Sequence, residues 1–450
     1  MRKIEEHNGI PLLIPSRVDY GENSYTIITG KNGVGKSRLI SEIARKYTDK
    51  YVTDREEYLF HSIYKSFDHP KVIAVSTSPF DKFPLNTKRN NAYEISNYRY
   101  VGMRSNKVNL SSVSLISSAI SGIFEQLTVG GGYERLIRVF EVLGFAPELQ
   151  FVFKINLDVY HKERRYDLDR DNELHRILMG MDIPLDRKVI DSLEGLDLPM
   201  VHEIVEALSF ITSLHNKNDI ISMNVDFYSS KRISFNGDLF GDENIMKPIS
   251  TLLKNNIIRI MDVKLDKNNF GPMSLRRASS GEQCMLVMML GIAGHITDSS
   301  LILIDEPEIS LHPKWQENFT SLLIDVFSEY KNCQFIIATH SPQIVSNLRA
   351  SSCFITSITK RKVYPADKFS KQSSDFQLAE LFDAPGNKNE YITRLSFSLL
   401  SKVKNQKCVY SEDKEQLRHL MNFLPDLRKD DAVYELIMTI KEVVGFYASN

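Results

Sequence analysis

The feature that most constrains this chain is a glycine-rich stretch, Gly30–Ser37 (GKNGVGKS), which joins an apolar segment to an amphipathic one. Residues 23–29 (NSYTIIT) predict a short buried strand, and residues 36–47 place apolar side chains at helical spacing. Glycines allow the loop between them to curl until its backbone N–H groups converge, and the following helix adds the positive end of its dipole. This order of strand, loop and helix is typical of polyphosphate binding. We therefore expect an α/β fold built around a phosphate-binding loop.

The loop predicts a role for its polar side chains. The Lys36 ammonium is expected to reach the β- and γ-phosphates, and the Ser37 hydroxyl to bind Mg²⁺. The alternative is a glycine-rich turn that precedes Lys-Ser by accident, which we expect in only on the order of one per cent of chains of this length. The residues expected to contact the nucleotide lie in the loop or directly after it: Gly30, Asn32, Gly33, Gly35, Lys36, Ser37 and Arg38.

A second motif places two acids at the end of a continuous apolar run, residues 301–305 (LILID). Such a run is typical of a strand in the middle of a parallel sheet, and ligands bind at the carboxyl end of such strands. Asp305 is expected to hold Mg²⁺, and Glu306 to orient and deprotonate the attacking water. Alone, the pair is equally compatible with surface acids that end a strand. Together with the phosphate loop it predicts a nucleotide site.

Two further motifs have a plain structural interpretation when each is taken alone. The turn at residues 279–283 (SSGEQ) precedes a helical run to about Ile296, and it predicts either a second anion site or a simple cap by Ser279 or Ser280. Residues 335–340 (FIIATH) predict a buried strand that ends at His340. A histidine at a strand end is usually structural, but here it follows the acidic strand, where it can contact a γ-phosphate.

Composition narrows the classes of partner. Lys and Arg number 56 against 57 Asp and Glu, a net charge of -1, so no global basic field attracts nucleic acid or an anionic membrane. The four cysteines form no CxxC pair, which predicts free thiols in a reducing compartment. The longest apolar stretch is about half a membrane span, and the first residues have no apolar core of a signal peptide. We expect a soluble cytoplasmic protein with no membrane partner.

In this order, the four motifs resemble those of the ATP-binding-cassette (ABC) ATPase superfamily. Gly30–Ser37 matches its phosphate loop, and residues 280–283 (SGEQ) resemble its signature motif, with the family's serine at Ser280. Residues 304–307 (IDEP) match its acidic strand, and His340 matches its switch histidine. The resemblance implies ATP and Mg²⁺ as cofactors. It also implies these site residues: Glu306 and His340 as catalytic, Ser37 and Asp305 as metal ligands, and Ser280 and Gly281 as nucleotide contacts.

The resemblance implies a shared mechanism as well. Two copies would face each other head to tail with two ATP molecules between them, so the first partner is the chain itself, as a dimer or a higher oligomer. Each ATP would touch Lys36 of one copy and Ser280 of the other. Closing the pair would exclude water, and hydrolysis would open it. Residues 309–313 (ISLHP) occupy the place of the loop that crosses this interface.

One departure from the family pattern concerns a glutamine that normally follows the strand at residues 72–76 and contacts Mg²⁺. Residues 76–81 (STSPFD) contain no glutamine, and Ser78 and Asp81 are the candidate substitutes. The family also stacks an aromatic ring on adenine. Tyr20 and Tyr25 are both candidates for this ring, and either can instead simply pack within the fold.

The spacing of the motifs separates the subfamilies. From Lys36 to Ser280 is 244 positions, more than in transporter ATPases, and no heptad repeat in this interval predicts a long coiled coil. The predicted fold class is an α/β ABC-type P-loop NTPase head with two lobes, a mixed but mainly helical insertion and a helical C-terminal region. The predicted boundaries are an N-terminal lobe at 1–110, the insertion at 111–255, a C-terminal lobe at 256–365 and the helical region at 366–450.

A compact insertion in an SMC- or OLD-like head resembles the ATPases of bacterial antiphage systems, most of all Septu (PtuA-type) and retron-associated ATPases, with the PARIS sensor ATPase as a neighbour. The resemblance implies a Mg²⁺-dependent ATPase that gates a separate effector, a nuclease encoded nearby. Two alternatives stay open. One is a DNA repair or recombination ATPase of the same superfamily, and the other is a nucleotide-locked oligomeric scaffold with little turnover, which the missing glutamine favours.

A nuclease within the chain is not favoured. Residues 408–413 (CVYSED) faintly resemble the first strand and acid of a Toprim domain, but only 37 residues follow Asp413, and no HNH constellation occurs. Nucleic acid stays open as a partner. The candidate contacts are short basic clusters, for which a solvated surface is the default interpretation: residues 164–165, 276–277 and 360–362.

Overall fold

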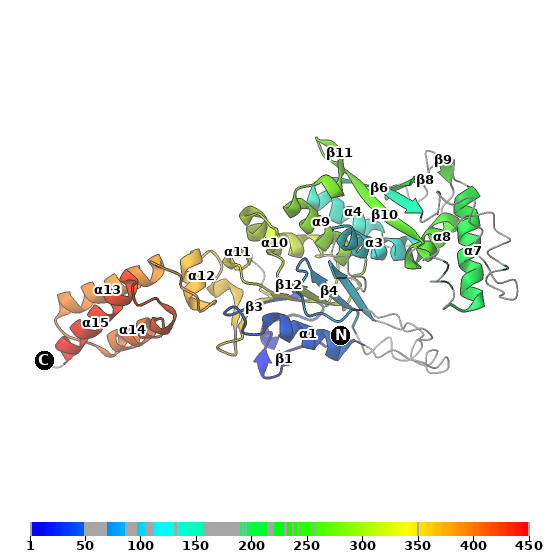
Figure 1. Ribbon diagram of the computed structural model, residues 1–450. Coiled ribbons are helices and arrows are strands. Elements are labelled where there is room, and N and C mark those ends of the chain that lie inside the picture. Colours follow the sequence, from blue (N-terminus) through cyan, green and yellow to red (C-terminus); the bar gives the residue numbers. More distant parts are fainter. Residues whose placement is uncertain are drawn as a thin grey trace.

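The computed structural model describes most of the chain. The described residues are 2–48, 70–85, 97–104, 112–129, 133–155, 176, 190, 193, 196–213, 220–228, 232–235, 238–240, 243–255, 257–348 and 351–448. Within them, the chain forms a layered α/β core, with a second sheet on one side and a small helical bundle at the other end (Figure 1). The basic pair at residues 164–165 lies outside the described residues.

The core is a seven-stranded sheet with the order β15-β14-β3-β13-β12-β4-β5. All neighbouring strands are parallel except β14 and β15. The sheet is rich in β-branched residues, and five of its strands are buried along their whole length, as expected for strands covered on both faces. The strands are β3 (Ser24–Thr29), β4 (Val72–Ser76), β5 (Tyr98–Gly102), β12 (Leu301–Asp305), β13 (Gln334–Ala338), β14 (Cys353–Ser357) and β15 (Lys362–Pro365).

Helices cover both faces of this sheet. On one face α1 (Lys36–Tyr47) packs its apolar stripe on alternate residues of the strands, such as Leu301 and Leu303. On the other face lie α3 (Ser112–Val129) and α9 (Ser280–Ala293), which pack on residues such as Ile302 and Ile304. Two more helices follow β12 and β13 along the chain: α10 (Pro313–Val326) and α11 (Pro342–Ser346).

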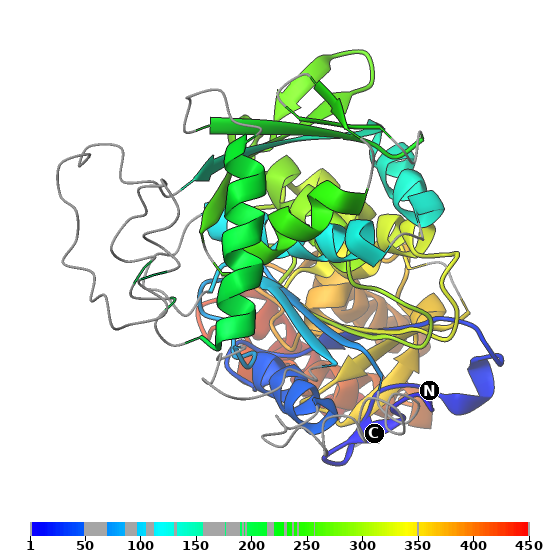
Figure 2. The same cartoon turned by 90° about the vertical axis from the view of Figure 1, so that its right-hand side faces the viewer.

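A second, antiparallel sheet has six strands in the order β11-β10-β6-β7-β8-β9. It lies on the far side of α3 and α9 from the central sheet (Figures 1 and 2). Strand β10 pairs with β6 from Ile258↔Ile155 onward, so strands from both sides of position 255 build one sheet. The strands are β6 (Phe145–Ile155), β7 (Ile220–Asp226), β8 (Arg232–Phe235), β9 (Asp238–Phe240), β10 (Ile258–Lys267) and β11 (Gly271–Ser274). The helices beside it are α4 (Tyr133–Leu143), α7 (Leu198–Ser213) and α8 (Glu243–Lys254).

The C-terminal region is helical, as the sequence predicts. After α12 (Ser374–Glu380), three helices form a bundle with its own apolar core, which projects from the end of the molecule opposite the six-stranded sheet (Figure 1). These helices are α13 (Glu390–Gln406), α14 (Ser411–Met421) and α15 (Ala432–Ala448). The remaining elements are β1 (Glu6–His7), β2 (Ile10–Pro11) and four short 3-10 turns: η1 (Pro15–Arg17), η2 (Leu275–Arg277), η3 (Ala366–Lys368) and η4 (Leu424–Asp426).

The mixed α/β architecture with a mainly parallel sheet fits the P-loop fold class that the sequence predicts. None of the helices in the described part of the chain combines the length and the apolar character that a membrane crossing requires.

Candidate functional site

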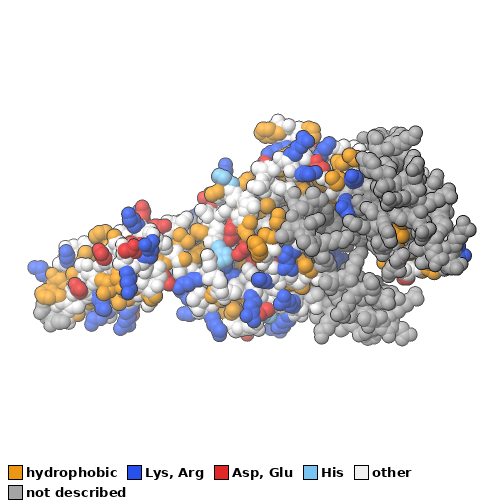
Figure 3. All heavy atoms as spheres, viewed as in Figure 1, with side chains coloured by type: hydrophobic (Ala, Val, Ile, Leu, Met, Phe, Trp, Pro, Cys, Tyr) orange, Lys and Arg blue, Asp and Glu red, His pale blue; other side chains and the backbone are white. Residues whose placement is uncertain are grey.

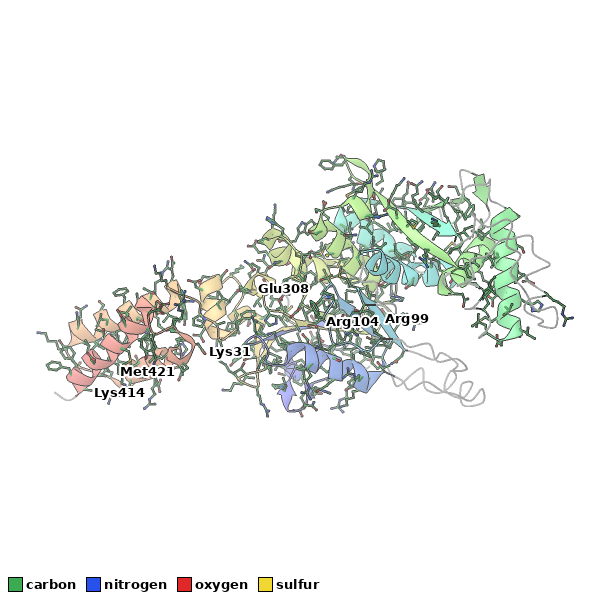
Figure 4. The ribbon with its side chains drawn as sticks, viewed as in Figure 1. Lys31, Arg99, Arg104, Glu308, Lys414 and Met421 are labelled. Carbon is green, nitrogen blue, oxygen red and sulfur yellow. The ribbon has the colours of Figure 1, made fainter. Side chains whose placement is uncertain are left out.

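Three neighbouring strands of the central sheet, β3, β13 and β12, bring the predicted residues to one edge. The phosphate loop follows β3, Asp305 ends β12, and His340 follows β13 by two residues. The Ser37 hydroxyl donates to Oδ1 of Asp305 at 3.0 Å, and Nζ of Lys36 lies 3.0 Å from Nδ1 of His340. Because carboxyl ends of parallel strands meet at one edge, residues about 270 to 300 positions apart form one polar cluster. Figure 4 labels Glu308 at this edge.

The phosphate loop has the backbone that its glycines allow. Gly30 has φ +146° and Gly35 has φ +104°, a region that side chains rarely adopt. A Cβ at position 30 would also meet the Val34 side chain at 3.0 Å. Of the other predicted contacts, Asn32 is exposed at the loop surface, and Arg38 is exposed and paired with Glu42 on α1 at 2.8 Å.

The Lys36 ammonium occupies the centre of this loop. Its Nζ donates to the carbonyl oxygens of Gly30 at 2.7 Å and Lys31 at 3.0 Å. Burial lowers the pKa of Lys36 to about 8, against the raising influence of nearby carboxylates, of which Glu308 is the strongest. A buried ammonium bound only to carbonyls and an imidazole is poorly neutralised, so the loop favours an anionic ligand.

Asp305 and Ser37 form the candidate cation position. Burial raises the pKa of Asp305 to about 7, the hydrogen bond from Ser37 lowers it, and neighbouring Glu306 and Asp81 raise it. A hydroxyl oxygen and a carboxylate oxygen 3.0 Å apart are ligands that a hard cation such as Mg²⁺ prefers. Phosphate oxygens and water would complete its coordination shell. A divalent ion here would also favour the ionised form of Asp305.

His340 connects the loop lysine to the acidic strand. Its Nδ1 faces the Lys36 ammonium, which is only a donor, so the ring proton lies on Nε2, 3.3 Å from Oε1 of Glu306. Burial and then the charge of Lys36 lower the pKa of His340 to about 4. The imidazole is therefore neutral at physiological pH and donates to the carboxylate of the predicted base.

Glu308 is a site residue that the sequence analysis missed. Its buried carboxylate accepts hydrogen bonds from Thr339 Oγ1 at 2.9 Å and from the backbone N–H of His340 at 2.5 Å. Burial raises its pKa, and the hydrogen bond from His340 lowers it. The only sequence signal is a third acid two positions after Glu306. Glu308 holds the segment that carries His340 and adds negative charge near Lys36.

The serine turn, residues 279–283, stands apart from the phosphate loop of its own chain. Ser279, not Ser280, caps α9: its Oγ accepts from the Glu282 N–H at 3.3 Å and donates to the Glu282 carboxylate at 3.0 Å. Ser280 is exposed, and in the described part of the chain no hydrogen bond joins it to the phosphate loop. Gly281 packs against the backbone after the acidic strand, where a Cβ would lie 3.2 Å from the carbonyl oxygen of Ser310.

The segment after β4, where the family's glutamine is missing, is held by local partners. Asp81 accepts from the Tyr100 hydroxyl at 2.7 Å and pairs with Arg104 at 3.4 Å. Ser78 is buried and accepts from the Phe80 N–H at 3.2 Å. Thr77 Oγ1 is buried with no hydrogen-bond partner among the described residues. Both candidate substitutes are therefore engaged, Ser78 within its own segment and Asp81 with Tyr100 and Arg104.

Other sequence candidates lie away from this cluster. Tyr25 is buried and stacks on Phe335 at 4.8 Å, whereas the ring of Tyr20 is fully exposed. Asp413, the Toprim candidate, begins a helix rather than ending a strand, and pairs with Lys402 at 2.7 Å. Lys360 is bound to the end of α12, and Figure 3 shows basic and acidic side chains interspersed over the visible face of the C-terminal bundle.

Comparison with known proteins finds one family match and several partial sequence similarities. Residues 203–346, which include α9, the acidic strand and His340, match the family described as "AAA domain, putative AbiEii toxin, Type IV TA system". The chain is 33% identical over 106 residues to the retron Ec83 probable ATPase of Escherichia coli, and 29% identical over 99 residues to the retron Vc95 probable ATPase of Vibrio cholerae. It is 36% identical over 77 residues to protein ea59 of Escherichia phage lambda.

These matches are partial. They cover 21%, 20% and 17% of this chain and 19%, 18% and 14% of the respective relatives, so the chain spans less than a fifth of the length of each relative. Over these segments the expected similarity to retron-associated ATPases is confirmed. The fold and the matched segments are similar to those of P-loop ATPases, and within that class the similarity is to the retron-associated type.

Proposed function

We propose that this protein binds and hydrolyses ATP with Mg²⁺ and uses its nucleotide state to control a separate effector, a nuclease encoded nearby, in defence against phage. The observation that carries the proposal is the convergence of Lys36, Ser37 and Asp305 at one edge of the sheet, with two side-chain pairs at 3.0 Å. The names of the retron relatives support an ATPase, and the resemblance of the motifs supports the defence context.

The residues of the loop supply binding. On nucleotide entry Lys36 leaves the carbonyl oxygens of Gly30 and Lys31 and pairs with the β- and γ-phosphates, which replace two neutral partners by charged ones. Ser37 and Asp305 hold Mg²⁺, which neutralises charge on the phosphates when bound.

The strand ends supply the chemistry. Glu306 has φ +49°, in the left-handed region, and its Oε1 lies 3.3 Å from Nε2 of His340. In this proposal Glu306 orients the attacking water and accepts its proton, and His340 holds that carboxylate through Nε2. Because phosphoryl transfer depends mostly on positioning and electrostatics, these contacts account for most of what the chain must provide.

The exposed serine turn supports a composite site. Since Ser280 has no bond to the phosphate loop of its own chain, we propose that it completes the nucleotide site of a second copy arranged head to tail. Support comes from its exposure at the first turn of α9, the end of the helix at which the dipole favours an anion.

The decisive experiment compares two variants. Lys36→Ala should lose nucleotide affinity, because the phosphates lose their main cation. Glu306→Gln should bind ATP but hydrolyse it slowly and accumulate as a closed dimer, measured by light scattering and phosphate release. Hydrolysis by Glu306→Gln at the wild-type rate would remove Glu306 as the base. Turnover that DNA stimulates without any partner protein would favour a DNA repair ATPase instead.

A second candidate is a nucleotide-locked scaffold that cages its partner and scarcely turns over. The observation that favours it is the absence of a glutamine after β4, where Asp81 is held by Tyr100 and Arg104. Phosphate release by the purified protein, measured with and without the product of the neighbouring gene, separates the two. Slow turnover in both cases would favour the scaffold.

A further inference from the structure

Lys31, the second residue of the phosphate loop, makes one contact through its backbone and another through its side chain. Its carbonyl oxygen accepts from Lys36 at 3.0 Å, and its own ammonium pairs with Oδ1 of Asp426 at 2.5 Å. Asp426 ends η4, in the connection between α14 and α15. Lys31 lies on the side of the core that faces the bundle (Figure 4). Met421 and Lys414, which are also labelled there, belong to the bundle. The ion pair therefore links the phosphate loop directly to the C-terminal bundle.

A second connection starts at the first residue of the loop. The turn between β14 and β15 packs over Gly30, where an added Cβ would lie 3.4 Å from Thr359 Oγ1. From that turn, Lys360 donates to the carbonyl oxygen of Glu380 at 2.6 Å and pairs with Asp383 at 3.4 Å. Both connections thus leave the loop within two adjacent residues and end at the C-terminal helices.

The helices α13, α14 and α15 share one core and are bonded to α12, so we infer that they move as one body. Their core is a separate apolar cluster, which includes Leu399 of α13, Leu420 of α14 and Ile437 of α15. Glu380 at the end of α12 bonds to both of the next two helices, through the Tyr391 hydroxyl at 3.0 Å and His419 Nε2 at 2.7 Å. A displacement at Asp426 is therefore shared by the helices rather than absorbed by one of them.

We propose that nucleotide binding to the phosphate loop breaks the Lys31–Asp426 ion pair, and that the bundle α13–α15 transmits the nucleotide state to the rest of the assembly. The inference rests on the proposed ATP binding. Lys36 must release the Lys31 carbonyl to reach the phosphates, which changes the backbone that holds the Lys31 side chain. The incoming polyphosphate also attracts the Lys31 ammonium and repels the Asp426 carboxylate.

The proposal gives Asp426 a measurable effect on affinity. In the empty loop its carboxylate is a negative charge beside an anion site and holds a cation away from it. Removing that charge should tighten nucleotide binding about two- to fivefold, the range expected for a half-exposed ion pair. The full-length Asp426→Asn variant would be titrated with the non-hydrolysable analogue AMP-PNP and Mg²⁺. The matched control is Asp430→Asn, which removes an ion pair with Arg428 in the same connection but not at the loop.

Hydrogen exchange tests the movement itself. In the wild type, AMP-PNP should speed the exchange of backbone amides at residues 422–431. Asp426→Asn and Lys31→Gln should each reach that level without nucleotide, and the double variant should exchange no faster than either one, because both remove the same contact. If Asp426→Asn does not fold, Lys31→Gln alone provides the test, because it removes the same ion pair.

The outcomes separate this inference from the function it rests on. If AMP-PNP does not bind the wild type, the proposed ATP binding fails and the inference fails with it. If AMP-PNP binds but neither the affinity of Asp426→Asn nor the exchange of residues 422–431 changes, only the inference is overturned. Equal changes in Asp430→Asn would also overturn it, since the effect would then be a general one of charge on the bundle.

Discussion

The Lys36 ammonium lies 3.0 Å from Nδ1 of His340, and the opposite nitrogen of the same ring lies 3.3 Å from Glu306. One neutral imidazole thus joins the cation that would hold the phosphates to the carboxylate that would activate water. Because Nδ1 accepts from Lys36, departure of the lysine toward a nucleotide leaves that nitrogen open to a new donor. The protonation of this cluster therefore depends on whether the loop is filled.

Asp305→Asn should stabilise the nucleotide-free protein, and more at high pH. The pKa of Asp305 is raised by burial from 3.8 to about 7, so the folded state binds more protons than the unfolded state between these values. The stability of the wild type therefore falls as pH rises through this window. The asparagine avoids that loss, so its advantage in urea unfolding should be on the order of 2 kcal/mol larger at pH 8 than at pH 5. An advantage that does not change with pH would contradict this.

Glu308→Gln should shift the pH dependence of nucleotide binding. The pKa of Lys36 is lowered by burial to about 8, and Glu308 is the strongest influence that raises it. Affinity for AMP-PNP in the wild type should fall as pH rises through about 8, where the lysine loses its charge. Without the Glu308 carboxylate the pKa of Lys36 drops further, so the fall should begin at lower pH. The control is Glu317→Gln on the exposed side of α10, whose profile should match the wild type.

Gly35→Ala should destabilise the protein by about 1–3 kcal/mol through backbone strain alone. Gly35 has φ +104°, and no atom lies within 4 Å of an added Cβ, so a clash does not contribute. Gly445 within α15 has the same open space but a helical backbone, and Gly445→Ala should gain up to about 1 kcal/mol. Chemical denaturation gives the free energy of unfolding of both variants and so separates backbone strain from steric clash as the cause. Equal changes in the free energy of unfolding at both positions would rule strain out.

Ser280→Glu should abolish the ATP-dependent dimer. In the proposed head-to-tail pair this position faces the γ-phosphate bound by the other copy, where a carboxylate is repelled. Light scattering of the variant in the Glu306→Gln background should show monomers with ATP, while AMP-PNP affinity stays within about twofold. Ser411→Glu is the matched control, because Ser411 is also an exposed serine that begins a helix. Dimers that persist in Ser280→Glu would place the serine outside the interface.

Local patterns predicted the parts of the fold that local forces determine. The helix at 36–47 and the strands at 72–76 and 301–305 match the structure at every residue. Each begins or ends at a glycine turn, a change of polarity or a charged residue, and each has one clear periodicity. The start of β6 shows the limit of local patterns, because it is set by a distant strand: β6 begins at Phe145, where it pairs with Lys267 of β10.

Long-range contacts set the limits for the site as well. Lys36, Ser37, Asp305, Glu306 and His340 could be brought together from the sequence because each ends or follows a strand, and parallel strands share an edge. The role of Glu308 could not be predicted from the sequence, because it depends on a contact with the backbone N–H of His340, 32 positions away. The pairing of Lys31 with Asp426 crosses 395 positions and leaves no pattern in the sequence.

The shared sheet of β6 and β10 has a practical consequence for shortening this protein. Although β6 lies within residues 111–255, the segment predicted as an insertion, it is the strand that β10 pairs with from Ile258 to Lys267. The chain runs from β10 through β11 and η2 directly into α9, which carries Ser280. A truncated version without the insertion would leave β10 paired only with the short strand β11, which would loosen the support of the serine turn. A minimal catalytic fragment must therefore keep β6 and cannot be cut at the boundaries of the insertion.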